Sequence, residues 1–224
     1  MPTDSANSLS KEVEAGQAVY SPRVLKLYDL FVLGLSNRLI WRCPSHHLLN
    51  LYNEHVTPNH LDVGVGTGYF LDHCRFPAPN PRLVLVDLNR NCLDATARRV
   101  GRYSPVTLQR NILQPFAVDG DKFDSIGLNY VMHCLPGTLP SKAIVFDHLQ
   151  ALLNPGGTLF GSTLLSTGVP RGYAARRLMS LYNRQGIFSN RSDSLQDLQQ
   201  ALSTRFTTWH VEPIGCAALF FGKR

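Results

Sequence analysis

The sequence predicts an α/β fold with a doubly wound, seven-stranded sheet that is mostly parallel and ends in an antiparallel hairpin. From residue 59 onward, short apolar runs alternate with segments of helical periodicity, which is typical of βαβ units in a sheet covered on both faces. Only residues 212–215 separate the last two apolar runs, and so short a connection requires an antiparallel pair. We therefore expect a parallel sheet that carries a C-terminal hairpin.

The composition fits a globular domain with a sizeable core. Hydrophobic residues make up 44% of the 224 residues and charged residues 17%, which excludes wholesale disorder. The formal net charge of +6 permits an anionic partner but does not require nucleic acid. Apolar stretches such as residues 30–35 are too short to span a bilayer. Five widely spaced cysteines and a polar N-terminus without a secretory signal indicate free thiols and a cytoplasmic location.

The chain is expected to divide into three parts. Residues 1–18 are predicted to form a flexible polar tail, residues 19–55 a helical lid, and residues 56–224 the core. Apolar residues recur at helical spacing in the lid. Pro22 suits the first turn of one helix, and Cys43-Pro44 marks a break before a second helix.

Within the core, apolar runs and helical spacing predict the elements in order. The seven strands are expected at residues 60–65, 82–87, 106–110, 123–129, 158–164, 206–211 and 216–221. Helices are expected at residues 91–101, 141–153, 171–183 and 194–205. Residues 154–157, Asn-Pro-Gly-Gly, are expected to form the turn into the fifth strand.

The most informative segment is LDVGVGTGYFL, residues 61–71, where the first strand is expected to turn into a helix. The loop consists largely of Gly64, Gly66, Thr67 and Gly68. Glycines let the backbone approach a ligand, and the helix N-terminus presents free N–H groups. A dinucleotide fingerprint would need GxGxxG and thus a glycine at Tyr69, whereas this spacing is GxGxG. Asp62 would repel a pyrophosphate and attract a cationic amino-acid group, directly or through an ordered water.

Polar side chains also end the next three predicted strands. Asp87 ends the second strand, where a carboxylate can accept both hydroxyls of a ribose. Leu88 follows and could pack on the face of an adenine, and Asn111-Ile112 lies at the end of the third strand, where an amide can bond the adenine edge. Asn129 ends the fourth strand. Ligands bind at the carboxyl ends of such strands, so we expect these residues to share one crevice.

Together these residues resemble the motif pattern of class I S-adenosylmethionine-dependent methyltransferases, and the resemblance covers residues 20–222. LDVGVGTGYFL is similar to the family's first motif, LVDLN to its ribose-binding acid, and RNIL to the motif beside adenine, which usually carries Asp at the position of Asn111. FDSIGLNYVMHCL and LLNPGGTLFGSTLL resemble the motifs of the fourth and fifth strands. The resemblance implies a Rossmann-like fold, S-adenosyl-L-methionine as cofactor, S-adenosyl-L-homocysteine as product, and no metal.

The N-terminal segment is similar to the entrance helix of the ubiquinone/menaquinone methyltransferase group. In that group an aromatic and a basic residue close over the cofactor, which implies Tyr28 and Arg42 as cofactor-binding lid residues. Quinone methyltransferases carry Arg-Asn after the fourth strand, whereas this chain has Leu128-Asn129. The closer likeness is to small methyltransferases of secondary metabolism. It implies methyl transfer to an O, N or C atom of a small-molecule acceptor.

Candidate residues for the acceptor come from the lid, the end of the fourth strand and residues 165–192, an insertion expected on the substrate side. His133 is the candidate general base because it lies just past the fourth strand; the alternative is a half-buried structural histidine. The candidate acceptor contacts are Tyr20, Trp41, Tyr130, His133 and Tyr173. Lid aromatics could form a cage for a flat acceptor or the sulfonium, and their alternative role is packing against the sheet.

Two other functions stay open at this point. The chain could be a non-methylating cofactor-binding protein or cyclase on the same fold, or a methyltransferase acting on RNA or protein. Nucleic acid is disfavoured, because arginines 171, 176, 177, 184 and 191 fit a solvated helix face and the Asn/Asp-Pro-Pro-aromatic motif of base methylation is absent. His46-His47 lacks an evident third ligand, so no metal site is predicted.

Overall fold

The computed structural model describes residues 34–224. The predicted tail, the first part of the predicted lid, and the candidates Tyr20 and Tyr28 lie outside the described residues. The strands of the described part are β1 (Asn59–Val63), β2 (Arg82–Asp87), β3 (Val106–Gln109), β4 (Phe123–Asn129), β5 (Leu153–Leu164), β6 (Thr208–Ile214) and β7 (Ala217–Lys223).

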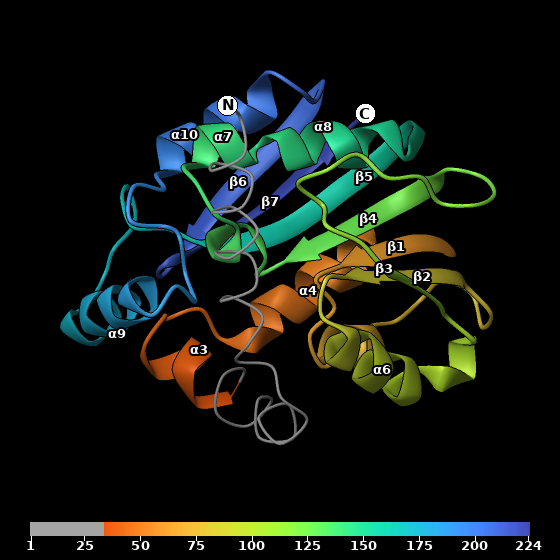
Figure 1. Ribbon diagram of the computed structural model, residues 1–224, viewed down its shortest axis with the longest axis horizontal. Helices are drawn as coiled ribbons and strands as arrows, with labels where there is room; N and C mark the ends of the chain where they lie inside the picture. Colours follow the sequence, from red (N-terminus) through yellow and green to blue (C-terminus); the bar gives the residue numbers. More distant parts are fainter. Residues whose placement is uncertain (1–33) are drawn as a thin grey trace, which may run out of the picture.

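These strands form one seven-stranded sheet in the order β3-β2-β1-β4-β5-β7-β6 (Figure 1). β1 to β5 pair in parallel, and β7 pairs antiparallel with both β5 and β6. The predicted fold class is therefore confirmed. The strand order reverses between β1 and β4, because the chain builds β1 to β3 outward in one direction and then returns to β4 on the other side of β1. Doubly wound sheets bind ligands at such a reversal.

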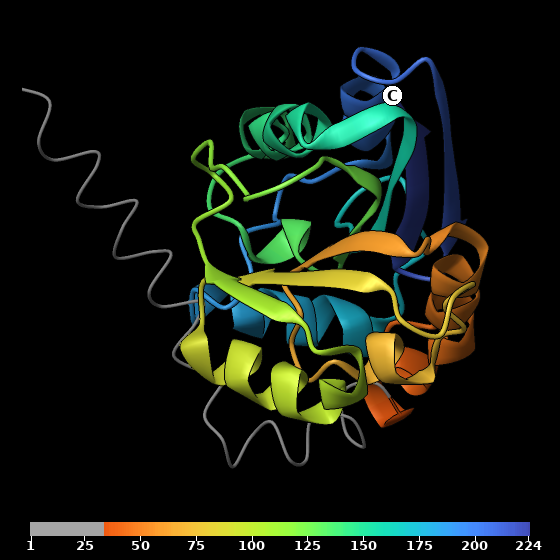
Figure 2. The same cartoon turned by 90° about the vertical axis from the view of Figure 1, so that its right-hand side faces the viewer.

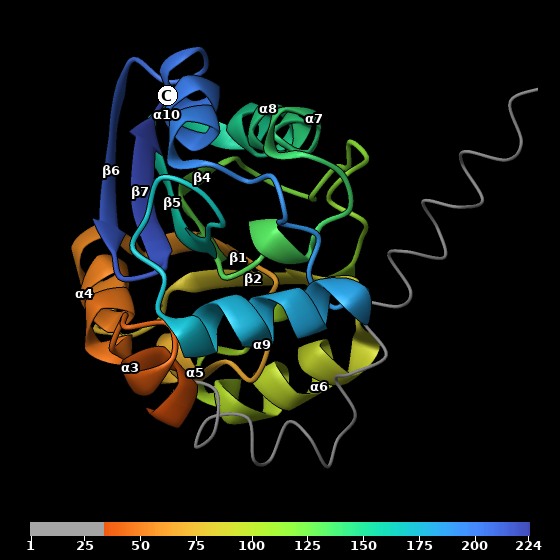
Figure 3. The ribbon, with the colours of Figure 1, turned by 90° about the vertical axis from the view of Figure 1, so that its left-hand side faces the viewer.

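Helices cover both faces of the sheet (Figure 3). One layer holds α3 (Asn37–Leu39), α4 (Ser45–His55), α5 (Tyr69–His73), α6 (Arg90–Arg99) and α9 (Tyr173–Arg184), and the other holds α7 (Leu139–Lys142), α8 (Ile144–Ala151) and α10 (Leu195–Ser203). Figure 2 shows α6, in yellow-green, on one side of the sheet and the green α8 on the other. Among the described residues, no helix combines the length and apolar character needed to cross a membrane.

Strand β2 shows why a continuous apolar run indicates a strand that is covered on both faces. Leu83 and Leu85 belong to the apolar core on the α4–α6 side, and Val84 and Val86 belong to the core under α8 and α10. Side chains alternate between the two faces of a strand, and both faces are covered, so the four buried positions from Leu83 to Val86 are all apolar.

The C-terminal hairpin turns later than predicted. β6 continues through Pro213 to Ile214, which pairs with Ala217, so the reversal lies at Gly215 and Cys216. β6 is an edge strand, where a proline costs little because its missing N–H is not needed for a second neighbour. Gly215 has φ +57°, the left-handed conformation that a glycine adopts readily.

Two predictions between β4 and β5 need correction. The single helix expected at residues 141–153 is two helices, α7 and α8, because Pro140 lies in the first turn of α7 and the chain starts a new helix after Ala143. The expected turn at residues 154–157 is an irregular part of β5. Leu153 pairs with Phe123, the next pair joins Thr158 to Ser125, and the register shifts between them.

The helix after Pro44 begins as predicted, and one of its faces packs into the core. α4 buries Leu48, Leu51 and Tyr52. These side chains lie in the same apolar core as Phe160 of β5 and Phe70 of α5. Burial on this scale stabilises the domain, since each large apolar side chain removed from water contributes about 1.5–3 kcal/mol.

Candidate active site

A pocket opens at the carboxyl ends of β1, β2 and β4, where the strand order reverses. Its lining includes the glycine loop after β1, the end of β2, the residues after β3 and the loop after β4, together with residues of α4, α5 and α6. The pocket contains these predicted cofactor residues: Asp62, Gly64, Gly66, Thr67, Gly68, Asp87, Leu88, Asn111, Ile112 and Asn129. Tyr130, predicted for the acceptor, also lines it. The fold thus gathers residues from four separate strands at one place.

The glycine loop has a backbone that side chains would obstruct. Gly64 has φ +70°, and a Cβ built there would lie 2.2 Å from Cγ2 of Val131 in the facing loop. Gly66 has φ +54°, and its Cβ would meet no atom within 4 Å. Gly64 therefore permits close approach of two loops, and Gly66 leaves open space that a side chain would occupy.

Asp87 is one of the two carboxylates that line the pocket. The N–H of Asn89 donates to its Oδ1 at 2.8 Å. Burial raises the pKa of Asp87 to about 6, and the backbone N–H groups of Asn89, Gly66, Leu88 and Val65 partly oppose this shift. The carboxylate is thus held beside the glycine loop and is largely ionised at neutral pH.

Asp62 is a second carboxylate on the pocket wall, and it is buried. The Tyr52 hydroxyl lies 2.8 Å and Nε2 of His60 3.3 Å from its Oδ2. Two of the predicted amides also line the pocket. Oδ1 of Asn111 accepts from the N–H of Leu113 at 3.0 Å, and Oδ1 of Asn129 accepts from the Ser162 hydroxyl. Each polar side chain is therefore oriented by contacts within the protein.

Three predicted contacts do not reach this pocket. Arg42 is exposed, and its guanidinium lies on the side of Gly172. Trp41 is buried in the core, with its ring centroid 6.1 Å from that of Phe188. Tyr173 is 69% exposed on α9. No residue of the expected substrate-side insertion, 165–192, is among the described residues that line the pocket.

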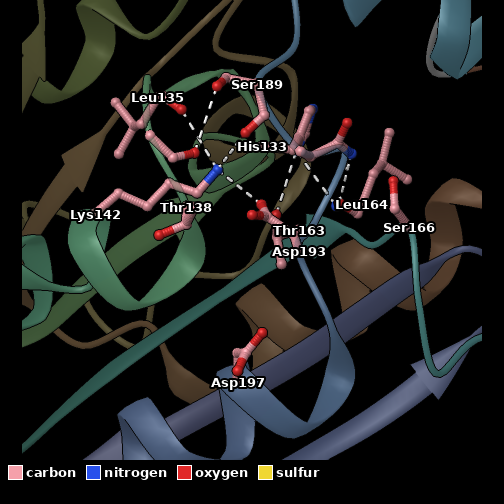
Figure 4. Close-up of polar contacts among 12 residues, drawn as sticks. His133, Leu135, Thr138, Lys142, Thr163, Leu164, Ser166, Ser189, Asp193 and Asp197 are labelled. Carbon is pink, nitrogen blue, oxygen red and sulfur yellow. Dashed lines mark hydrogen bonds and ion pairs between the residues drawn. The ribbon is translucent and has the colours of Figure 1, made fainter.

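His133 is also absent from the pocket lining, and it is buried among the contacts drawn in Figure 4. Its Nδ1 accepts from the N–H of Leu164 at 3.3 Å, and its carbonyl accepts from the N–H of Ser189 at 2.8 Å. Burial, reinforced by the charge of Lys142, lowers the pKa of His133 to about 3. A buried imidazole of this pKa is a poor proton acceptor, so its place in the fold favours the structural alternative over a general base.

Sequence reasoning missed several residues of the pocket. Tyr69, Cys92, Arg110, Cys134, Leu135 and Pro136 adjoin the predicted motifs or strand ends, so position alone could have suggested most of them. Tyr52 comes from α4, far from any motif. Its only signal was helical spacing from Leu48, which indicates a buried face and not a pocket.

Among the described residues, no group of three or more His, Cys, Asp or Glu side chains could hold a metal ion. The rings of His46 and His47 lie against each other, with centroids 4.1 Å apart. The polar groups that line the pocket include the carboxylates of Asp62 and Asp87, the amides of Asn89, Asn111 and Asn129, the Arg110 guanidinium and several hydroxyl groups.

A doubly wound sheet with a GxGxG loop after β1 and an acid after β2 defines the Rossmann-like class of methyltransferases. Residues 61–159 match a family described as Methyltransferase domain. The chain is 37% identical to demethylluteothin O-methyltransferase of Streptomyces thioluteus, covering 98% of this chain and 97% of that protein. It therefore belongs to this methyltransferase family and is an S-adenosylmethionine-dependent enzyme.

Further relatives agree with this assignment. The chain is 37% identical to the physcion biosynthesis cluster O-methyltransferase of Aspergillus chevalieri, over 92% of this chain and 94% of that protein. The structure of the N-methyltransferase NodS from Bradyrhizobium japonicum WM9, in complex with S-adenosylhomocysteine, superposes with a TM-score of 0.60 at 17% identity. That alignment covers 97% of this chain and 98% of NodS, and it shows a shared fold.

Proposed function

We propose that the chain methylates an acidic hydroxyl, a phenol or an enol, on a flat small molecule of secondary metabolism. The observation that carries this proposal is the contrast between the two sides of the pocket. The side at β1 and β2 holds the two carboxylates, whereas the loop after β4 presents Tyr130, Val131, Cys134, Leu135 and Pro136. The first side suits a nucleoside joined to an amino acid, and the second suits an apolar acceptor.

The residues present fit S-adenosylmethionine, which, when bound, supplies a methyl group activated by a sulfonium. Asp87 can accept hydrogen bonds from both ribose hydroxyls, and the open space at Gly66 leaves room beside it. Asn111 and Ile112 follow β3, and Asp62 lies on β1. Adjacent strands are about 4.8 Å apart, so the row from β3 to β4 extends over about 14 Å and separates the subsites for base, ribose and amino acid.

The acceptor side offers little help with deprotonation. Burial raises the pKa of Cys134 to about 12, so its thiol stays protonated at neutral pH. His133 does not line the pocket. The protein's contribution is therefore alignment and exclusion of water, which suits an acceptor whose hydroxyl ionises readily. Relatives named O-methyltransferases support an oxygen acceptor.

A transfer assay tests the proposal. The enzyme is incubated with methyl-labelled S-adenosylmethionine and three matched aromatic acceptors: a phenol, an enolic pyrone and an aromatic amine. We expect label in the phenol or the pyrone, with one equivalent of S-adenosylhomocysteine formed for each methyl group transferred. Labelling of the amine alone would contradict an oxygen acceptor and leave the cofactor assignment intact.

Replacing Gly64 by alanine is expected to weaken binding of S-adenosylhomocysteine about tenfold. The left-handed backbone costs about 1–2 kcal/mol for a residue with Cβ, and the new methyl group would displace Val131 on the opposite wall. Isothermal titration calorimetry measures the effect. Gly156→Ala is the matched control, because Gly156 has φ +78°, no atom within 4 Å of its Cβ position and no place in the pocket. Equal affinity in both variants would contradict the prediction.

Binding of S-adenosylhomocysteine is expected to weaken as the pH falls through about 6, because the ribose hydroxyls need the ionised form of Asp87. Burial raises this pKa above its usual value, so a proton must leave the carboxyl before binding at lower pH. Between pH 7.5 and pH 5 we expect a loss of about tenfold, with a plateau above pH 7. Calorimetry across this range measures it. Asp87→Asn should bind weakly and independently of pH; a flat profile for the wild type would contradict the prediction.

A further inference from the structure

A chain of polar side chains runs from the residues just before β1 to Asp62 in the pocket lining, and all of its members are buried except Thr57, which is partly buried. Its members, in spatial order, are Thr57, Ser125, His60, Asp62 and Tyr52. They come from the segment just before β1, from β1 itself, from β4 and from α4, so only the assembled fold brings them together. None of these contacts belongs to the glycine loop or to the surroundings of Asp87.

The carboxylate of Asp62 is held at one oxygen by two donors. The Tyr52 hydroxyl donates to Oδ2 at 2.8 Å, and Nε2 of His60 lies 3.3 Å from the same atom. Burial and the neighbouring carboxylate raise the pKa of Tyr52 well above its usual value, so the phenol remains a donor at neutral pH. Within the described structure, Oδ1 of Asp62 has no hydrogen bond and is available to a ligand in the pocket.

The orientation of His60 is set from its other side. The N–H of Thr57 donates to Oγ of Ser125 at 3.0 Å, and Oγ of Ser125 lies 2.8 Å from Nδ1 of His60. When the Ser125 hydroxyl donates to Nδ1, the ring carries its proton on Nε2, which then donates to Asp62. This tautomer satisfies both contacts of the buried ring, whereas the other would set a lone pair against the carboxylate.

Burial makes these contacts strong. The side chain of His60 has 0% exposure and that of Asp62 has 3%. A hydrogen bond to an ionised acceptor is stronger in such surroundings than in water, and an unpaired buried carboxylate is costly. The network therefore keeps the Asp62 carboxylate, which lines the pocket, in one orientation.

We propose that Tyr52 and His60 are positioning residues that hold the Asp62 carboxylate toward the ammonium group at the amino-acid end of the cofactor. The inference rests on the cofactor site described under Proposed function and goes beyond it by adding residues outside every motif. Asp62 lies on β1, one strand away from Asp87 and two from the residues after β3. If the Asp62 carboxylate loses its orientation, binding of the amino-acid end should therefore weaken, and binding of the nucleoside should not change.

Two ligands separate these effects. S-adenosylhomocysteine carries the amino-acid end, and 5′-methylthioadenosine retains the nucleoside but lacks that end. In calorimetry, Tyr52→Phe is expected to bind S-adenosylhomocysteine about tenfold more weakly than the wild type and 5′-methylthioadenosine equally well. Tyr103→Phe is the matched control, because Tyr103 does not line the pocket and contacts Phe76 and Arg102. Its affinity for both ligands should equal that of the wild type.

A second pair of variants tests the role of the hydrogen bond itself. His60→Gln keeps an N–H group that can reach Asp62, whereas His60→Leu removes it. We expect His60→Gln to bind S-adenosylhomocysteine like the wild type and His60→Leu to lose affinity for this ligand alone. If thermal melting shows that Tyr52→Phe does not fold, the two His60 variants still test the positioning role.

The outcomes are distinguishable. Selective loss of S-adenosylhomocysteine affinity supports the positioning role. Equal weakening of both ligands, or no weakening of either, overturns it while the cofactor site stands. Failure of the wild type to bind either ligand overturns the cofactor site, and the positioning role with it.

Discussion

Asp87→Ala is expected to weaken binding of S-adenosylhomocysteine by about 100-fold or more. The carboxylate lies at the end of β2, inside the pocket, beside the glycine loop. In the proposed cofactor site, Asp87 accepts two hydrogen bonds from ribose hydroxyls; such bonds to an ionised group are worth about 1.5–3 kcal/mol each, and the alanine variant would lose both. Calorimetry on the purified variant measures the loss, and activity with a phenolic acceptor should fall in parallel.

The matched control for this prediction is Asp94→Ala. Asp94 is on α6, forms an exposed ion pair with Arg90 at 2.9 Å and does not line the pocket. The Asp94→Ala variant removes the same charge from the protein, so it corrects for any effect of net charge on ligand binding. Wild-type affinity in Asp87→Ala would show that the ribose subsite lies elsewhere.

Lys142→Met is expected to destabilise the protein by about 3–5 kcal/mol. The Lys142 ammonium and the Asp193 carboxylate are 2.7 Å apart, and both side chains have 0% exposure (Figure 4). The ammonium also donates to the carbonyls of Ser189 at 2.7 Å and Leu135 at 3.4 Å. Burial lowers the pKa of Lys142, and Asp193 opposes that shift. The methionine variant leaves Asp193 without its buried partner.

Urea unfolding measures this loss as a lower midpoint at an unchanged slope. Replacing both partners, Lys142→Met with Asp193→Leu, should recover most of the stability, since an apolar pair leaves no uncompensated charge. Lys122→Met is the matched control on an exposed lysine, expected within about 0.5 kcal/mol of the wild type. A Lys142→Met variant as stable as this control would contradict a structural role for the ion pair.

The two buried networks lie on different sides of the pocket. The Lys142 ammonium holds the carbonyl of Leu135, which lines the wall after β4, and the Tyr52 hydroxyl holds Asp62 on β1. Pocket geometry therefore depends on groups that are not themselves part of the lining, such as Lys142 and Asp193. The free energy of unfolding of Lys142 and Asp193 variants should therefore be measured before any change in their ligand affinity is interpreted.

Most of the fold could be predicted because its signals are local. The apolar run of β2 indicated a strand covered on both faces, and Cys43-Pro44 marked the start of α4 correctly. The hairpin turn was placed too early because Pro213 is a turn signal in most contexts. An edge strand tolerates it, and edge position is a property of the assembled sheet.

The gathering of the candidate cofactor residues in one pocket could also be predicted, because each lies at or just after the end of a strand. Gly64, Asp87 and Asn129 meet at one edge of the sheet whenever the strands are parallel and in this order. The acceptor residues could not be predicted in this way. Trp41 and Tyr173 share an aromatic character, yet one is buried in the core and the other is exposed on α9.

The sequence by itself determined the doubly wound sheet, the glycine loop and the acid at the end of β2, because periodicity and strand-end motifs are read from neighbouring residues. Only the tertiary structure decided which side chains meet across elements. It buried His133, packed one face of α4 into the core, and brought the Tyr52 hydroxyl to Asp62. The physical reason is that such contacts depend on how helices pack on the sheet, and no local pattern in the sequence encodes that packing.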